Sequence, residues 1–194
     1  MRNATLALAT ACALLSGCLL PDRFDATLEV GAERATLDYR GELVAMSAHA
    51  DAAKLTPAED EKAVREALEA VAADVRRDGG TVDYAPLGKG RAKAAVAWTQ
   101  TLPPVGGKTT FADLVAIRRQ TDGSLEIVTP ALKDRDRAQL AKMGLGDAAG
   151  RLCVKTAGTV VESNAQTKPN AAGGCWGWSI AVLKDAPVRM VVRF

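Results

Sequence analysis

Apolar and polar residues alternate with a period of two along most of the chain, the pattern of strands that bury one face. The clearest run is residues 24–30 (FDATLEV), and residues 34–43 alternate again after a turn. Because turn residues join such runs in pairs, the sequence predicts an antiparallel sheet built from hairpins. The further predicted strands are residues 81–87, 91–102, 114–120, 124–129, 151–156, 158–163, 176–183 and 188–194.

Two segments change to helical spacing. Residues 57–77 follow Thr56, with Pro57 at the first helical position and Glu59 placed to complete a capping box. The apolar residues of this segment recur at intervals of three and four, so they form one stripe that packs against a sheet. A shorter helix is predicted near residues 133–143.

The predicted fold class is therefore α+β. The sheet is expected to be antiparallel and can be strongly curved. Both helices are expected to pack on one of its faces. Residues 24–194 are expected to form a single domain with a substantial core. The Pro- and Gly-rich residues 102–110 and the Ala-rich segment around His49 are expected to be loops.

The first residues have the three parts of a secretory signal. Arg2 is basic, and residues 4–15 are uncharged and apolar but shorter than the ~20 residues of a spanning helix. The following Leu15-Ser16-Gly17-Cys18 resembles the bacterial lipobox. This resemblance implies a signal peptide of residues 1–17, cleavage between Gly17 and Cys18, and a diacylglyceryl group with palmitate-type chains on Cys18. An ordinary secretory signal with a coincidental Cys is the alternative.

The lipobox interpretation predicts where the protein lies. Two or three acyl chains on Cys18 would anchor it stably to a membrane. Sorting signals in similar lipoproteins place Asp after the Cys for inner-membrane retention, so Leu19 favours the inner leaflet of the outer membrane, facing the periplasm. Residues 18–23 are expected to be the lipidated Cys and a short tether that reaches at most ~18 Å, which would hold the domain close to the headgroups.

Charge and cysteine content narrow the partners and the compartment. The chain has 25 Lys and Arg against 23 Asp and Glu, without a basic patch, which argues against nucleic acid as a partner. Cys153 and Cys175 would remain as a pair in an oxidising compartment and are predicted to form a disulfide worth about 3 kcal/mol. Two small buried thiols are the alternative.

Candidate chemistry is sparse. His49 is the single histidine, so a nucleophile pair or a zinc site has too few partners, and we interpret it as an exposed loop residue. Gly106-Gly107-Lys108-Thr109 lacks the first glycine of a phosphate-binding loop and is interpreted as a turn. The sequence predicts no catalytic residue, no metal ligand and no cofactor.

The tryptophans are the remaining candidates. Trp176 and Trp178 lie two apart on one predicted strand and therefore on one face, and Trp98 lies on another strand. They either fill the core or line an apolar face that contacts an acyl chain or a protein partner.

The lipobox, the FDATLEV strand after it, the order of hairpin, helix and hairpin, and Asn164-Ala165 before a Trp-containing strand together resemble the LppM-type bacterial lipoproteins. That resemblance implies an α+β domain with an apolar cavity that binds lipid. It assigns no individual binding residue. Some members of that family also have a C-terminal membrane anchor, for which this chain has no matching apolar segment.

Three functions are consistent with these features. The first is a non-enzymatic envelope lipoprotein that binds a lipid or apolar ligand, or an envelope protein, near the membrane surface. The second is a structural or assembly lipoprotein without a small ligand. The third is an envelope enzyme.

Overall fold

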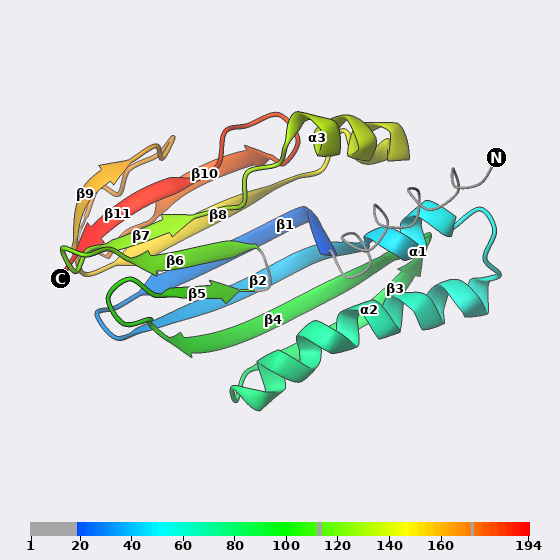
Figure 1. Ribbon diagram of the computed structural model, residues 1–194, viewed down its shortest axis with the longest axis horizontal. Coiled ribbons are helices and arrows are strands. Elements are labelled where there is room, and N and C mark those ends of the chain that lie inside the picture. The colour runs from blue at the N-terminus through cyan, green and yellow to red at the C-terminus, as the bar shows by residue number, and fades with distance from the viewer. Residues whose placement is uncertain (1–18, 112–113, 172) are drawn as a thin grey trace, which may run out of the picture.

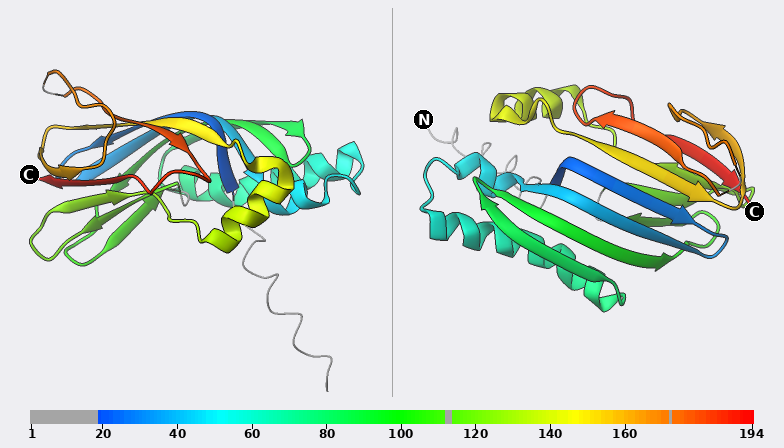
Figure 2. Two further views of the ribbon diagram at one scale, coloured as in Figure 1. Left: turned by 90° about the horizontal axis from the view of Figure 1, so that it is seen from above. Right: turned by 180° about the vertical axis from the view of Figure 1, so that it is seen from behind.

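The computed structural model describes residues 19–111, 114–171 and 173–194, and these have an α+β fold. The expected signal peptide, the cleavage site at Gly17 and the lipidated Cys18 lie outside the described residues. Within them, eleven strands form two sheets, which lie as two layers (Figures 1 and 2). The expected α+β class is confirmed, but two packed sheets replace the single sheet that was expected.

The larger sheet has six strands in the order β10-β8-β1-β2-β4-β3. Its neighbours are antiparallel except for β1 and β8, which are parallel, because the chain forms most of the second sheet before it returns to β1. The strands are β1 (Leu19–Val30), β2 (Arg34–Ala45), β3 (Thr81–Gly88), β4 (Arg91–Thr101), β8 (Ala149–Thr156) and β10 (Trp176–Ala181).

The smaller sheet is antiparallel throughout, in the order β5-β6-β7-β11-β9. One of its strands, β5, falls in the segment that was expected to be a loop. The turn at Gly106, whose φ is +78°, brings the next residues alongside β6. The strands are β5 (Lys108–Phe111), β6 (Val115–Arg119), β7 (Leu125–Val128), β9 (Thr159–Ser163) and β11 (Arg189–Arg193).

The long helix α2 (Pro57–Arg77) agrees with its prediction. The capping box is present, since the backbone N–H of Thr56 donates to Glu59 and that of Glu59 donates to the Thr56 hydroxyl. The buried stripe of α2 packs on the larger sheet, on the same side as the smaller sheet (Figure 2). Its apolar buried residues are Val64, Leu68, Ala72 and Val75.

The second helix differs from its expected position. Leu140 and Leu145 pack with Leu20 and Val44, whereas α2 packs with the cluster that contains the adjacent Leu19 and Ala45. Neighbouring residues of a strand point to opposite faces, so the two helices cover opposite faces at this end of the sheet. The elements concerned are α3 (Asp134–Leu140) and the π-helical turn η1 (Ala141–Leu145), with a third helix, α1 (Met46–Asp51), after β2.

Strand β1 begins earlier than expected, so residues 19–23 belong to the sheet and do not form a tether. A bulge interrupts the pairing between Asp22 and Asp25, where Arg23 has a φ of +46°. The bulge moves the buried side chains from one face of the sheet to the other. The alternation of apolar and polar residues is therefore broken at this point, so it does not reveal that the strand begins earlier.

The bulge places the ring of Phe24 between two glycines. Phe24 stacks on Tyr39 with ring centroids 5.7 Å apart. It packs against the backbone of Gly41 on β2, while its ring lies against Gly150 on β8. The inner face therefore closes around Phe24 because these two positions lack a Cβ.

We expect Gly41→Ala to lower the free energy of unfolding by about 1–3 kcal/mol, because its Cβ would overlap that of Phe24. Gly146→Ala is the matched control, since a Cβ there meets no atom within 4 Å and its φ of −59° suits alanine. Urea denaturation of both variants provides the measurement. Equal midpoints would contradict the close packing of Phe24.

Candidate functional site

The end of the domain next to Cys18 is built from several elements. Leu19, the residue after the expected lipid attachment site, pairs with Ala45 at the end of β2. The backbone N–H of Ala45 donates to the carbonyl of Gly90 in the β3–β4 turn, 2.8 Å away. Figure 1 shows this end at the right, with α1, the start of α2 and the β3–β4 turn gathered near the start of β1. We call it the anchor end.

A buried ion network fixes the start of β1 to its neighbours. The Asp22 carboxylate accepts from Arg91 Nη1 at 2.9 Å, and Glu42 accepts from the same nitrogen at 2.7 Å. Asp22 also accepts from the backbone N–H of Ala149 at 3.3 Å, so the network joins β1, β2, β4 and β8. Burial opposes the charge of Arg91, but hydrogen bonds to Glu42 and Asp22 outweigh it, so the Arg91 pKa lies above its ordinary value.

The position of His49 was predicted wrongly as an exposed loop. It lies in α1 and is half-buried, because its ring bridges two other elements. Nδ1 is 2.7 Å from the carbonyl oxygen of Lys89 in the β3–β4 turn, and Nε2 is 3.0 Å from that of Met143 in η1. Because its two ring nitrogens face carbonyls of different segments, His49 links α1 to the β3–β4 turn and to η1.

The tryptophans do not form one exposed face. Trp98 and Trp178 are each 5% exposed, and their indole N–H groups donate to Asp78 and Asn164, respectively. Trp98 also meets Phe111 edge-on, with ring centroids 5.6 Å apart, so it fills the space between the sheets. Trp176 is half-buried beneath Lys168, whose Nζ is 6.0 Å from the ring centroid.

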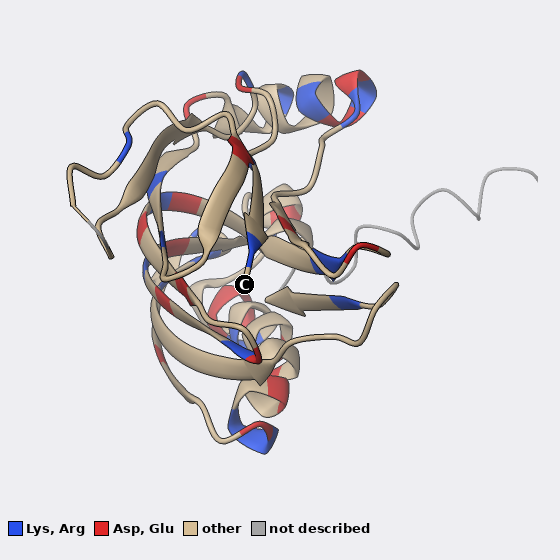
Figure 3. Cartoon of the chain, turned by 90° about the vertical axis from the view of Figure 1, so that its left-hand side faces the viewer, with Lys and Arg blue, Asp and Glu red and all other residues tan. Residues whose placement is uncertain are grey.

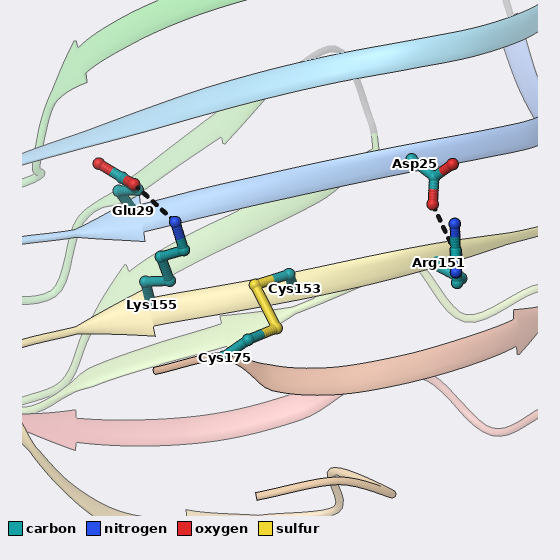
Figure 4. The surroundings of a disulfide bond; sticks show 6 residues. All are labelled: Asp25, Glu29, Arg151, Cys153, Lys155 and Cys175. Atoms are coloured by element: carbon teal, nitrogen blue, oxygen red, sulfur yellow. Dashed lines mark hydrogen bonds and ion pairs between the residues drawn. A yellow bond between two sulfur atoms is a disulfide. The ribbon is translucent and has the colours of Figure 1, made fainter. Parts of the chain in front are cut away.

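The predicted disulfide is present. Cys153 lies on β8 and Cys175 immediately precedes β10, with their Cα atoms 5.4 Å apart. Figure 4 shows the bond between two ion pairs that join β1 to β8. One is Asp25 with Arg151 at 2.6 Å, and the other is Glu29 with Lys155 at 3.3 Å.

The disulfide borders a groove on the outer face of the larger sheet, the face turned away from the smaller sheet. The groove has a volume of about 530 Å³. The segment after β9 forms one wall, because Gln166 is hydrogen-bonded to the backbone of Ser179 through both side-chain atoms, at 2.6 and 3.0 Å. We call it the outer groove; the lining residues that can bond a ligand include Asp25, Thr27, Asp38, Arg40, Arg151 and Thr167.

The charges of the outer groove alternate in sign. Asp25 pairs in register with Arg40 on β2 and with Arg151 on β8, so a carboxylate lies between two guanidinium groups on one face. The hydrogen bond from Arg151 lowers the Asp25 pKa, which keeps the pair ionised. Figure 3 shows both signs of charge mixed along the strands. Ala26, Leu152 and Trp178 add apolar surface between these charges, so the lining can contact both polar and apolar groups of a ligand.

Sequence reasoning missed the outer groove because its residues come from four strands and a loop far apart in the chain. Isolated charges on the outward face of a strand give the same pattern as an ordinary solvated face. Among the described residues, no three His, Cys, Asp or Glu side chains lie together as a metal site, and no helix is both long and apolar enough to cross a bilayer.

We expect reduction of Cys153–Cys175 to lower the free energy of unfolding by about 3 kcal/mol, since the bond closes a loop of 22 residues. Denaturation with and without dithiothreitol measures this difference. In the Cys153→Ser, Cys175→Ser control, dithiothreitol should have no effect. A similar stability of the oxidised and reduced chains would contradict a stabilising role.

Neither a scan against protein-family models nor a search of curated proteins finds a match for this chain. The resemblance to LppM-type lipoproteins therefore stays a prediction from the sequence.

Proposed function

We propose that this protein is a non-enzymatic envelope lipoprotein, anchored through Cys18, that binds an envelope partner in its outer groove. One observation carries the proposal: β1 begins at Leu19, directly after the lipobox cysteine. A lipobox that runs directly into a central strand leaves no spacer between the lipid and the domain, which supports a function at the bilayer surface. The inner leaflet of the outer membrane is the proposed location.

The filling of the core favours an envelope partner over an enclosed acyl chain. Trp98 and Trp178 occupy the space between the sheets, where an apolar ligand of an LppM-like domain would have to lie. The outer groove presents carboxylates, guanidinium groups and hydroxyls around a largely apolar surface. A lining of both kinds matches the surface of another protein.

The outer groove also lies at a suitable distance from the membrane. Asp25 is seven residues after Cys18, so a strand running away from the bilayer would place it ~23 Å from the lipid attachment. A partner in the periplasm would reach this position without entering the headgroups.

The other two functions need different evidence. A structural lipoprotein would use the sheet surface without a specific groove. An enzyme would need convergent free ionisable groups, whereas the Asp25 carboxylate in the groove is paired with Arg151 at 2.6 Å.

We expect Cys18→Ser to move the protein from the membrane fraction to the soluble periplasmic fraction, because no acyl chain can be attached. Fractionation with mass determination of the mature N-terminus provides the measurement. Ser16→Ala is the matched control, since it keeps the cysteine and a small residue in the lipobox. Membrane association of Cys18→Ser equal to that of the native chain would overturn lipid anchoring.

A photo-crosslinking amino acid at Asp38, in the outer groove, is expected to give an adduct of defined mass in intact cells. The same group at Asp83, exposed on β3 outside the groove, is the control and should not. Arg40→Glu reverses one groove charge and should reduce the adduct at Asp38. Equal adducts at both positions, or none, would contradict the groove as a partner site.

A further inference from the structure

We propose that the anchor end binds anionic phospholipid headgroups through Lys89 and Lys142, so that the domain has one fixed orientation on the bilayer. This inference rests on the lipid anchoring at Cys18 proposed above. It adds a second contact with the membrane, made by the folded domain itself.

The first argument is the length of chain between the lipid and the fold. Leu19 follows Cys18 and already pairs with Ala45. Ala45 in turn is hydrogen-bonded to Gly90 at 2.8 Å. Neighbouring strands are ~4.8 Å apart, so the β3–β4 turn lies about two strand spacings, ~10 Å, from the start of β1. Acyl chains on Cys18 would therefore bring this turn to the headgroups.

The second argument is that the turn is held rigidly. The N–H of Gly90 donates to the buried carboxylate of Asp60 at 2.7 Å, while His49 bonds the carbonyl of Lys89. Nε2 of the same imidazole lies 3.0 Å from the carbonyl oxygen of Met143, so the residue beside it, Lys142, is held near the turn. Two lysines from segments far apart in the sequence are thus presented at one end of the domain.

The third argument is the unusual backbone of Lys89. Gly88 pairs with Arg91, which leaves Lys89 and Gly90 as a two-residue turn with φ angles of +55° and +70°. Such type I′ turns favour Asn-Gly, because at positive φ the Cβ of an ordinary residue crowds the backbone, a cost that asparagine offsets by local hydrogen bonding. A lysine in a strained position indicates a role beyond the folding of the turn.

The fourth argument is the state of the charges. Lys54 and Lys184, also near this end, are paired with Asp51 and Asp147 at 2.7 and 3.3 Å. In the part of the chain that the structure describes, neither Lys89 nor Lys142 has a carboxylate within 4.0 Å, and both side chains are exposed.

An apolar side chain accompanies these amines. Leu87, two residues before Lys89, is 55% exposed. Amines beside an exposed apolar side chain match the interface of an anionic bilayer, where phosphates meet acyl chains. The start of α2 at this end is acidic, with Glu59 and Glu61 exposed, so the proposed contact with the anionic leaflet is confined to the β3–β4 turn, Leu87 and η1.

The first test uses the mature lipidated protein in vesicles of phosphatidylcholine with phosphatidylglycerol. Hydrogen exchange, compared with the soluble Cys18→Ser protein, should slow in residues 46–56, 86–90 and 141–147 and stay unchanged in residues 150–156. Slowing elsewhere, or none in a protein whose mass shows the lipid, would overturn the fixed orientation. A mature protein whose mass shows no lipid would overturn the anchoring instead.

The second test separates membrane contact from stability. Soluble Cys18→Ser protein should bind the same vesicles about fivefold more weakly for each lysine removed in Lys89→Asn and Lys142→Gln. Lys89→Asn should also raise the unfolding temperature, because asparagine tolerates the positive φ. The control pair is Arg34→Gln and Lys108→Gln, two exposed cations at the other end of the sheet. Equal loss of binding in the test and control pairs would overturn the proposal.

Discussion

The fold depends on how β1 is fixed where it enters the larger sheet. At that point the bulge at Arg23 changes which face of β1 is buried, and the Asp22 carboxylate is buried beside it. Such a charge is tolerated only with a close partner, which Arg91 supplies from β4. The same guanidinium holds Glu42 on β2, so one cation sets the positions of three strands. The Asp22 carboxylate also accepts from the backbone N–H of Ala149, which fixes the start of β8 beside β1.

Several features were predictable because they depend on local chemistry. The capping box at Thr56 and Glu59 defines the start of α2 through neighbouring atoms, and most hairpins follow from turn residues beside alternating strands. The disulfide was also predictable, since two cysteines left as a pair after the expected signal peptide form a bond in the oxidising compartment that this signal predicts. In each case the evidence lies within one segment or one pair of residues.

Other features depend on contacts that no single segment encodes. Pro21 and Asp22 do not have the composition of a strand, yet they pair with β2 because Arg91 compensates the charge. Strand β5 forms because its backbone pairs with the edge strand β6, although its own sequence is typical of a turn. The role of His49 depends on carbonyl groups 40 and 94 residues away. The outer groove could not be predicted for the same reason, because strand pairing alone brings Arg40 and Arg151 to either side of Asp25.

The lipid attachment proposed for Cys18, next to a central strand, would also determine how the protein responds to mechanical load. A pull on the acyl chains would act along the axis of β1, parallel to its neighbours. The ladder hydrogen bonds to β2 and β8 run across that direction, so they would be loaded in shear and would share the force. A strand held at an edge would instead peel away one bond at a time. A lipid on Cys18 would therefore load the domain in the direction in which a sheet resists extraction best.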